Sequence, residues 1–270
     1  MSNVVLGLIA PHSPRLARED AVPAPFDLMV RGLLSLREDL ARVRPDVTVL
    51  VSSHFLTTFL LYVDAAARHQ GRVTATECPD LVSSLPYDFP GHPRFAHALA
   101  EAARAQEIPL MAFENPDFVL DYGTVVPARY LFGEAVRPLV PVSVSIVGSL
   151  EEAIRLGRVV AQVAERLDLR VAVVASGALS HRVVRGPERW PEPEDQGWDQ
   201  RFLGVLGEGD RERALEFLPQ FIQAASVEAW GKHLGFLLGA MPSRFTIDFK
   251  TYGPSSGSGN ASVAIYPTAQ

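Results

Sequence analysis

The chain has 270 residues, of which 47% are hydrophobic and 21% are charged, and its formal net charge is −6 at pH 7. This length suffices for a sizeable hydrophobic core, and the composition is that of an ordinary globular protein. The negative net charge, together with the lack of a Lys/Arg cluster among aromatic residues, argues against a surface that binds nucleic acid or an anionic membrane.

Cysteine content and the first residues narrow the cellular setting. The chain has a single cysteine, Cys78. One cysteine cannot form an internal disulfide, nor a zinc or iron–sulfur site built from several cysteines. The first ten residues have no basic segment before the apolar run, so we expect no signal peptide. No apolar run approaches the roughly 20 residues that a membrane helix needs, and the sequence therefore predicts a cytoplasmic protein.

Apolar runs separated by Pro, Gly and polar residues predict strands that alternate with helices. The first strand is expected in Val4–Pro14, where Pro11 ends the apolar run. Further strands are expected at Val47–Ser53, Thr58–Val63, Val140–Val147, Val171–Ser176, Phe245–Phe249 and Ser262–Tyr266. Helices are expected at Pro23–Arg44, Arg94–Gln106, from Ala128–Phe132 onward, at Ser149–Leu167, and once or twice within Arg211–Met241. This order predicts an α/β fold in which residues 1–270 form a single domain with a central, mixed β-sheet flanked by helices.

Segments rich in Pro, Gly or charge are expected to connect these elements. They are a long functional loop or insert at Arg68–Pro93, a loop at Asn115–Pro127, an exposed loop at Arg185–Gly197 and a tight turn at Gly253–Asn260. The last of these resembles a phosphate-binding loop in its glycines. It lacks the Gly-Lys-Ser/Thr ending and is followed by a strand, so we interpret it as a turn.

Three of the seven histidines come shortly after apolar strands: His12, His54 and His181. In open α/β sheets, ligands gather at the carboxyl ends of strands. We expect the first two strands to be neighbours joined by a crossover helix, which would bring the rings of His12 and His54 together. The other four histidines lack this context: His69, His92, His97 and His233. Of these, we expect His69 and His97 to be solvated.

Glu228 is the one acidic residue in the apolar, helix-like run Ala224–Met241. A buried carboxylate is costly unless it is paired or bound to a metal, so it needs a partner. Lys232, four residues further along, would give an ordinary ion pair on one helix face. Alternatively, Glu228 meets the two strand-end histidines at a metal ion. His233 lies about 140° around the helix from Glu228, so it is not expected to share this face.

Two histidines and one carboxylate on one face of a metal leave positions open for substrate and oxygen. This donor set is that of the non-haem Fe(II) oxygenases, and zinc hydrolases use a similar set. The residue types alone therefore leave both chemistries open. His181, as a strand-end histidine that is not a ligand, suits proton transfer because imidazole titrates near neutral pH.

Short motifs in a fixed order point to a family. They are APHSP around His12, VSSHF around His54, LDYGTVVP around Tyr122, SGALSHR around His181 and the segment around Glu228. With these motifs, the chain resembles the class III (LigB-type) extradiol ring-cleavage dioxygenases. The segments YDFPG at Tyr87–Gly91 and TYGPSSGSGNA at Thr251–Ala261 also look similar to family segments, so the resemblance covers essentially the whole chain.

The resemblance implies a role for each of these residues. The ferrous ligands of the family fall on His12, His54 and Glu228, and its acid–base histidine falls on His181. The implied reaction is insertion of O2 into the ring of a catechol-type or 2-aminophenol-type aromatic, which gives a ring-opened semialdehyde. The implied cofactor is Fe(2+), and the implied partners are the aromatic substrate and O2. The family also implies a homo-oligomer, with or without a second subunit.

One position departs from much of the family. Many members carry Asp-His-Gly, whereas this chain has Asp121-Tyr122-Gly123, which looks similar to the members that cleave 2-aminophenols. A phenol can hydrogen-bond a substrate or oxygen, but at neutral pH it cannot act as a cationic imidazolium. Tyr122 is therefore a second candidate catalytic residue, and one that bears on the choice of substrate.

Two other functions share this fold or this donor set. One is a non-catalytic binding protein that resembles the Memo type, and the other is a zinc-dependent hydrolase on the same histidines. The presence of all three candidate ligands together with His181 favours an enzyme over an inactive scaffold.

Overall fold

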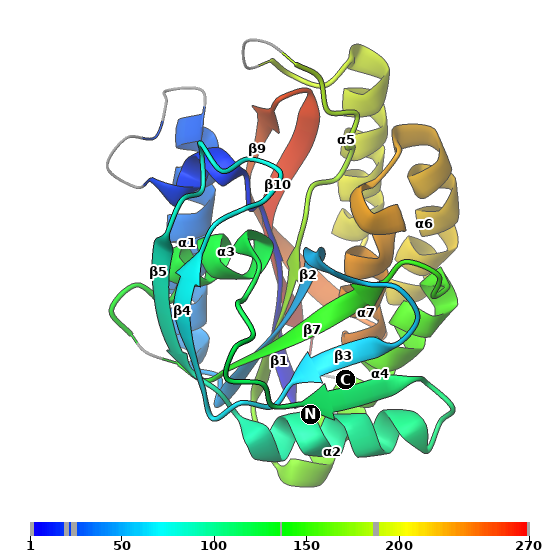
Figure 1. The fold of residues 1–270 in the computed structure, drawn as a ribbon. Helices are drawn as coiled ribbons and strands as arrows, with labels where there is room; N and C mark the ends of the chain where they lie inside the picture. The colour runs from blue at the N-terminus through cyan, green and yellow to red at the C-terminus, as the bar shows by residue number, and fades with distance from the viewer. Residues whose placement is uncertain (1–2, 19–21, 23–25, 136, 186–188, 269–270) are drawn as a thin grey trace.

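Eight strands form one mixed sheet with helices on both faces, which confirms the predicted fold class (Figure 1). The computed structural model describes residues 3–18, 22, 26–135, 137–185 and 189–268. The strands are β1 (Val4–Ala10), β2 (Val47–Thr57), β3 (Leu61–Asp64), β4 (Arg68–Val73), β5 (Leu85–Pro90), β6 (Leu110–Phe113), β7 (Leu139–Ser145), β8 (Val171–Ser176), β9 (Phe245–Ser255) and β10 (Ser258–Pro267). The helices are α1 (Asp27–Val43), α2 (Pro93–Arg104), α3 (Tyr122–Phe132), α4 (Leu150–Leu167), α5 (Pro193–Gly207), α6 (Arg211–Ala225) and α7 (Lys232–Ala240).

The order of strands in the large sheet is β6-β3-β7-β2-β8-β1-β10-β9. The central strands β7, β2, β8 and β1 are parallel, whereas β10 is antiparallel to both β1 and β9. The prediction that the first two strands are neighbours is wrong, because β8 lies between β1 and β2. The carboxyl ends of three adjacent parallel strands therefore meet at one edge of the sheet.

Helices cover both faces of the sheet. On one face α1 packs on β1, β9 and β10, and α3 packs on β2 and β8. On the other face α7 packs on β1, β2 and β8, and α2, α4, α5 and α6 extend that layer (Figure 1). Alternate residues of β2 belong to different cores, with Val49 and Val51 in the core under α7 and Leu50 in the core under α1 and α3. Burial on both faces explains why the central strands are unbroken apolar runs.

The segment Arg68–Pro93, predicted to be a long loop or an insert, is an insert with secondary structure of its own. It contains β4 and β5, which pair antiparallel as a separate two-stranded sheet. Leu85, Tyr87 and Phe89 alternate along β5 and are buried. Pro86 and Pro90 hide this alternation in the sequence, since proline is rare inside sheets.

Two further helix boundaries differ from the sequence prediction. α3 begins at Tyr122 rather than near Ala128, because Asp121 caps its N-terminus and accepts the Thr124 N–H at 3.0 Å. α5 begins at Pro193, inside the predicted loop Arg185–Gly197, with a proline and acidic residues in its first turn. Residues 186–188 of that loop, and residues 23–25 at the start of the first predicted helix, lie outside the described residues.

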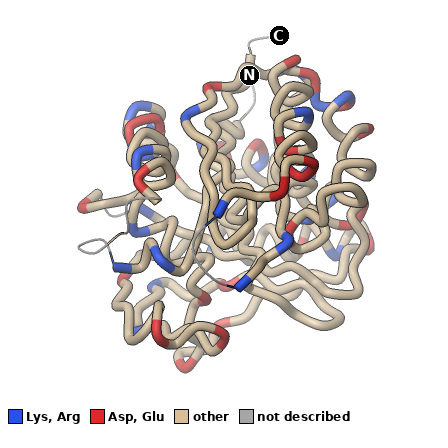
Figure 2. Tube along the Cα trace, turned by 90° about the horizontal axis from the view of Figure 1, so that it is seen from above, with Lys and Arg blue, Asp and Glu red and all other residues tan. Residues whose placement is uncertain are grey.

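Charged residues are distributed over the outer helices and loops. Figure 2 shows Lys and Arg interspersed with Asp and Glu along these segments. In the part of the chain that the structure describes, no helix is long and apolar enough to cross a membrane.

α4 and α7 approach each other so closely that each has a glycine at the contact. A Cβ at Gly157 of α4 would lie 2.0 Å from the Phe236 carbonyl oxygen, and one at Gly239 of α7 would lie 2.1 Å from the Ile154 carbonyl oxygen. The two backbones can touch only because these Cβ atoms are missing. The contact fixes α7, and with it the turn that precedes α7 and carries Glu228.

Gly239→Ala is expected to lower the free energy of unfolding by about 1–3 kcal/mol, because the two helices must separate to admit the methyl group. Urea unfolding followed by circular dichroism measures this change. Gly204→Ala on α5 is the matched control, since a Cβ there meets nothing within 4 Å. Alanine favours the helix at that exposed position by up to about 1 kcal/mol. Equal stability of Gly239→Ala and the unmodified chain would contradict the close crossing.

Candidate metal centre

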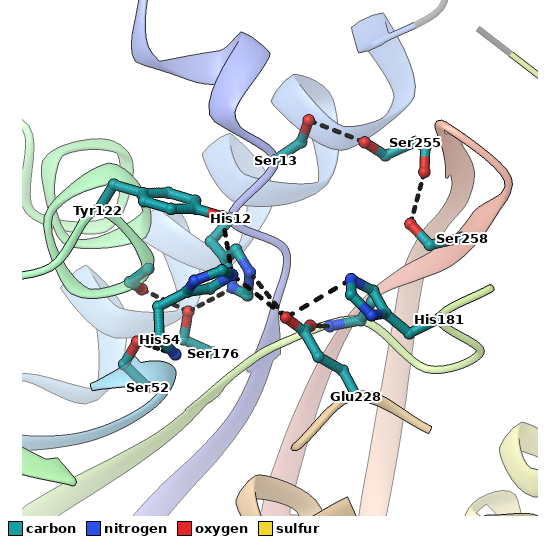
Figure 3. A network of polar contacts seen from close by, with 12 residues as sticks. His12, Ser13, Ser52, His54, Tyr122, Ser176, His181, Glu228, Ser255 and Ser258 are labelled. Carbon is teal, nitrogen blue, oxygen red and sulfur yellow. Dashed lines mark hydrogen bonds and ion pairs between the residues drawn. The ribbon is translucent and has the colours of Figure 1, made fainter. Parts of the chain in front are cut away.

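Four predicted site residues from distant parts of the chain converge at the carboxyl edge of the sheet (Figure 3). His12 lies just after β1, His54 lies near the end of β2, and His181 lies after β8. Glu228 comes from the turn between α6 and α7. Figure 3 shows the three imidazole rings around the Glu228 carboxylate.

One oxygen of Glu228, Oε1, is the centre of this cluster. It lies 3.3 Å from His12 Nε2, 3.4 Å from His54 Nε2 and 3.7 Å from His181 Nε2. The side chains of His12 and Glu228 are 6% exposed, whereas those of His54 and His181 are 23% and 35% exposed. The cluster is therefore closed on the side of His12 and open toward His54 and His181.

The orientation of His12 follows from a chain of hydrogen bonds. Ser176, at the end of β8, has a single hydroxyl proton and donates it to the Gly123 carbonyl. Its oxygen is left to accept Nδ1–H of His12, at 3.1 Å. A proton on Nδ1 leaves the Nε2 lone pair of His12 directed at the cluster, as a metal ligand requires.

Pro127 explains why the Gly123 carbonyl is free to accept this bond. Pro127 lies inside α3 and has no N–H, so the carbonyl four residues earlier lacks its helical donor. The Ser176 hydroxyl takes that donor's place. Gly123 also has no room for a side chain, because a Cβ would lie 2.5 Å from Ser52 Oγ. The LDYGTVVP motif thus orients His12 through Ser176, in addition to placing Tyr122 beside the cluster.

His54 is held through both nitrogens of its ring. It lies where β2 loses its register with β7, between Val51 and Leu56. Its Nδ1 is 3.1 Å from Glu77 Oε1, and its Nε2 is 2.7 Å from the Tyr122 hydroxyl. The Glu77 carboxylate accepts Nδ1–H, and the Tyr122 hydroxyl donates to Nε2. As in His12, Nε2 is the ring nitrogen that lies beside Glu228.

The run Ala224–Met241, predicted to be helical around Glu228, is not an α-helix there. α6 ends at Ala225, and Glu228–Gly231 forms a 3-10 turn before α7. Ala229 and Trp230 have φ angles of 47° and 54°, a left-handed conformation that is strained for residues other than glycine. Such a conformation persists only where the surrounding structure holds it in place.

Glu228 is tied to the segment that precedes His181. Its backbone N–H donates to the Leu179 carbonyl at 3.2 Å, and its Oε2 accepts the Ala178 N–H at 2.5 Å. Lys232 is not its partner, because Lys232 Nζ donates to the carbonyls of residues 145 and 146. The ordinary helix ion pair is therefore replaced by contact with three imidazoles.

The ionisation of Glu228 is set by two opposing effects. Burial raises the pKa of Glu228, but the positive charge that His12, His54 and His181 carry when protonated outweighs burial and holds that pKa well below the usual range. The carboxylate is thus an anion at neutral pH. A divalent cation bound here would replace the protons on the two Nε2 atoms and supply the positive charge that the buried anion needs.

The donor geometry fits a metal ion. One ligand atom from each of His12, His54 and Glu228 lies within 4.8 Å of the others. A metal about 2.0–2.2 Å from nitrogen and oxygen ligands keeps neighbouring ligand atoms about 3.0–3.4 Å apart. The contacts of 3.3 and 3.4 Å between Glu228 Oε1 and the two Nε2 atoms match this spacing. The three residues predicted as ligands are therefore in place to hold a metal.

Tyr122 and His181, the two predicted catalytic residues, lie beside these donors. The Tyr122 ring centroid is 4.3 Å from that of His54 and 5.7 Å from that of His12. Burial and neighbouring acidic groups raise the pKa of Tyr122, so its phenol stays protonated at neutral pH. Burial, assisted by His12 and His54, lowers the pKa of His181.

The remaining histidines lie outside the donor group. His97 is exposed, as predicted. The prediction of a solvated ring is wrong for His69, which is buried with Nδ1 3.0 Å from Asp64 Oδ2. His92 caps the N-terminus of α2, and His233 is fully buried.

The fold and the site agree with one protein family. A family model described as the catalytic LigB subunit of aromatic ring-opening dioxygenase matches residues 6–265. The chain belongs to the LigB family. The match spans every residue of the candidate centre, so the cluster of this LigB chain lies wholly within the family region.

Relatives of this LigB chain are named as dioxygenases. It is 26% identical to 3,4-dihydroxyphenylacetate 2,3-dioxygenase of Escherichia coli over 183 residues, which span 65% of this chain and 66% of that enzyme. It is also 26% identical to the 2-aminophenol 1,6-dioxygenase beta subunit of Pseudomonas sp over 286 residues, spanning 96% of this chain and 93% of that subunit. The crystal structure of an uncharacterized protein from Escherichia coli K12 has the same fold, with a TM-score of 0.70, 20% identity and coverage of 96% of this chain and 99% of that one.

Two residues that orient the ligands were not predicted from the sequence of this LigB chain. Ser176 carries a weak signal, since it is the polar residue that ends an otherwise apolar strand. Glu77 carries none, because it lies in the connection between β4 and β5, and only the folded chain brings it to His54.

Ser176→Ala is expected to weaken metal binding by about 10–100-fold, because His12 loses the acceptor that fixes its tautomer and ring orientation. Anaerobic calorimetric titration with Fe(II) or Zn(II) measures the affinity. Thr48→Val is the matched control, since Thr48 is a buried β2 hydroxyl at the opposite end of the strand and has no hydrogen-bond partner among the described residues. An unchanged affinity in Ser176→Ala would contradict the tautomer assigned to His12.

Proposed function

We propose that this chain is a non-haem Fe(II)-dependent extradiol dioxygenase that opens the ring of a catechol-type or 2-aminophenol-type aromatic to a semialdehyde. The observation that carries the proposal is the convergence of His12, His54 and Glu228, with His181 beside them, in a LigB-family chain. Residues 1–270 would form one catalytic domain. The names of the relatives, at about 26% identity, support the reaction class.

The three donors would bind the iron from one side. When bound, the iron supplies Lewis-acid and redox chemistry between the aromatic ring and O2. His12 and Glu228 are buried and exclude water from their side of the cluster. The more open flank, at His54 and His181, is where a planar ring would enter.

His181 would transfer protons. Its Nε2 lies 3.7 Å from Glu228 Oε1, so a substrate heteroatom held beside the carboxylate comes within hydrogen-bond reach of the imidazole. The ring then accepts a proton from the substrate hydroxyl or amino group and returns one as the ring opens. Partial exposure of His181 lets this proton exchange with solvent.

Tyr122 would act as a neutral hydrogen-bond donor. Its hydroxyl donates to His54 Nε2, the lone pair that a metal would take. Because one lone pair cannot serve both, the hydroxyl in the loaded enzyme turns to a substrate heteroatom or to O2. A neutral phenol at this place supports a 2-aminophenol-type substrate, in line with the name of the Pseudomonas relative.

The chain would act as an oligomer, of identical copies or with a second subunit. The Pseudomonas relative is named as a beta subunit, which supports an assembly of more than one chain. Exposed apolar side chains at Phe59, Val147 and Trp230 offer contact area for a neighbour.

Protein loaded anaerobically with Fe(II) is expected to consume O2 with at least one member of a panel of catechols and 2-aminophenols. An oxygen electrode measures the O2 consumed, and absorbance measures the yellow ring-opened product that forms. Glu228→Ala should lose both iron and O2 uptake. His181→Ala should keep its iron and lose turnover by about 100–10,000-fold, because only proton transfer is removed.

The control variant is His97→Ala, which removes an exposed histidine remote from the donors and should keep both iron and turnover. Stoichiometric zinc without O2 uptake would contradict the proposal and favour a zinc-dependent hydrolase. Absence of both metal and uptake would favour a non-catalytic binding protein of the Memo type.

A further inference from the structure

Helix α5 presents two buried carboxylates, one turn apart, toward the segment that carries His181. They belong to Asp195 and Asp199, which are 2% and 0% exposed. Neither is part of the donor group His12, His54 and Glu228. Two carboxylates buried so close together are costly, so their partners indicate what they do.

Asp199 binds the residue just before His181. Its Oδ1 accepts the backbone N–H of Ser180 at 2.9 Å, and its Oδ2 accepts the Ser180 hydroxyl at 2.7 Å. Oδ2 also accepts the Tyr252 hydroxyl at 2.5 Å, and the Ser180 hydroxyl oxygen in turn accepts the Gly259 N–H at 3.2 Å. Burial raises the pKa of Asp199 to about 6, against the three donors that favour the anion. Ser180 is thus held by both its main chain and its side chain.

Asp195 binds the residue just after His181. Its Oδ1 accepts Arg182 Nε–H at 3.0 Å, and Arg182 donates with another nitrogen to the Ala224 carbonyl at 2.6 Å. Both neighbours of His181 are therefore held by one face of α5. The Arg182 side chain is 52% exposed, so this second hold is the looser one.

The opposite side of the same segment is attached to the Glu228 turn. Ser180 pairs with Val227, and Leu179 accepts the Glu228 N–H. The segment therefore lies between α5 and the turn that carries a candidate ligand. Among the described residues, the His181 backbone itself forms one bridge, with Ser258. The distance from His181 Nε2 to Glu228 Oε1 therefore depends largely on how the residues next to His181 are held.

We propose that Asp195 and Asp199 are positioning residues for His181, which fix its imidazole relative to Glu228 by holding Ser180 and Arg182. Asp199 binds the main chain as well as the side chain of Ser180, so it contributes more to the position of His181 than Asp195 does. The proposal rests on the proposed function, in which His181 transfers protons. A proton donor or acceptor on a segment that is attached to a rigid helix keeps its geometry better than one on a free loop.

The competing explanation is that these carboxylates only stabilise the fold. Asp39 on α1 is the matched control for that explanation, because it is also 2% exposed and pairs with Arg42 at 2.6 Å and Lys250 at 2.9 Å. Asp39→Asn removes a buried, paired carboxylate of similar burial on the other side of the sheet. It should lower stability and leave turnover unchanged.

Turnover of the Fe(II)-loaded protein provides the first test. Asp199→Ala is expected to lower kcat by about 100-fold, since a misplacement of about 1 Å costs that much, with KM within about threefold and iron content unchanged. Asp199→Asn and Asp195→Asn should lower kcat less. In a His181→Ala background, Asp199→Ala should cost no further turnover, because its effect passes through His181. Additive losses, or an equal loss in Asp39→Asn, would overturn the proposal.

Nuclear magnetic resonance of the Zn(II)-loaded protein with labelled histidines provides a second test that does not depend on ring cleavage. The His181 signal is assigned by its loss in His181→Ala. It should shift or broaden in Asp199→Asn and stay in place in Asp39→Asn. An unchanged His181 signal in Asp199→Asn would overturn the positioning role, whereas failure of O2 uptake alone would count against the proposed function and not against this role.

Discussion

A buried carboxylate that requires partners organises this structure. Glu228 is 6% exposed, and its Oε1 lies within 3.7 Å of three imidazoles that come from three different strand ends. Removing an anion from water is unfavourable without such partners. The left-handed turn at Ala229 and Trp230 and the close crossing of α4 and α7 both serve to bring this one side chain to the edge of the sheet.

The orientation of the ligands depends on contacts beyond the ligands themselves. Pro127 interrupts the hydrogen bonds of α3, the freed Gly123 carbonyl takes the Ser176 proton, and Ser176 then fixes Nδ1–H of His12. Glu77 does the same for His54 from the connection between β4 and β5. Both rings therefore direct Nε2 lone pairs to one point, which is the arrangement a divalent metal needs.

The sequence predicts the parts of the site that depend on local signals. Apolar runs ending in histidine place His12, His54 and His181 at one edge of a sheet, and motif order assigns the family. The sequence does not predict that β8 lies between β1 and β2, because strand order is decided by packing between residues far apart in the chain. The helix break at Glu228 is also missed, since positive φ angles at non-glycine residues leave no sequence signal. The contact between Asp199 and Ser180 cannot be predicted from the sequence either, because it joins two segments that only the folded chain brings together.

Anomalous diffraction at the iron absorption edge, from crystals grown anaerobically with Fe(II), tests the central claim most directly. The account predicts one iron peak about 2.0–2.2 Å from His12 Nε2, His54 Nε2 and Glu228 Oε1. It also predicts that Ser176 and Glu77 stay hydrogen-bonded to the Nδ1 atoms on the far sides of the two rings. Iron bound through Nδ1, iron bound elsewhere, or no iron at the cluster would contradict the account.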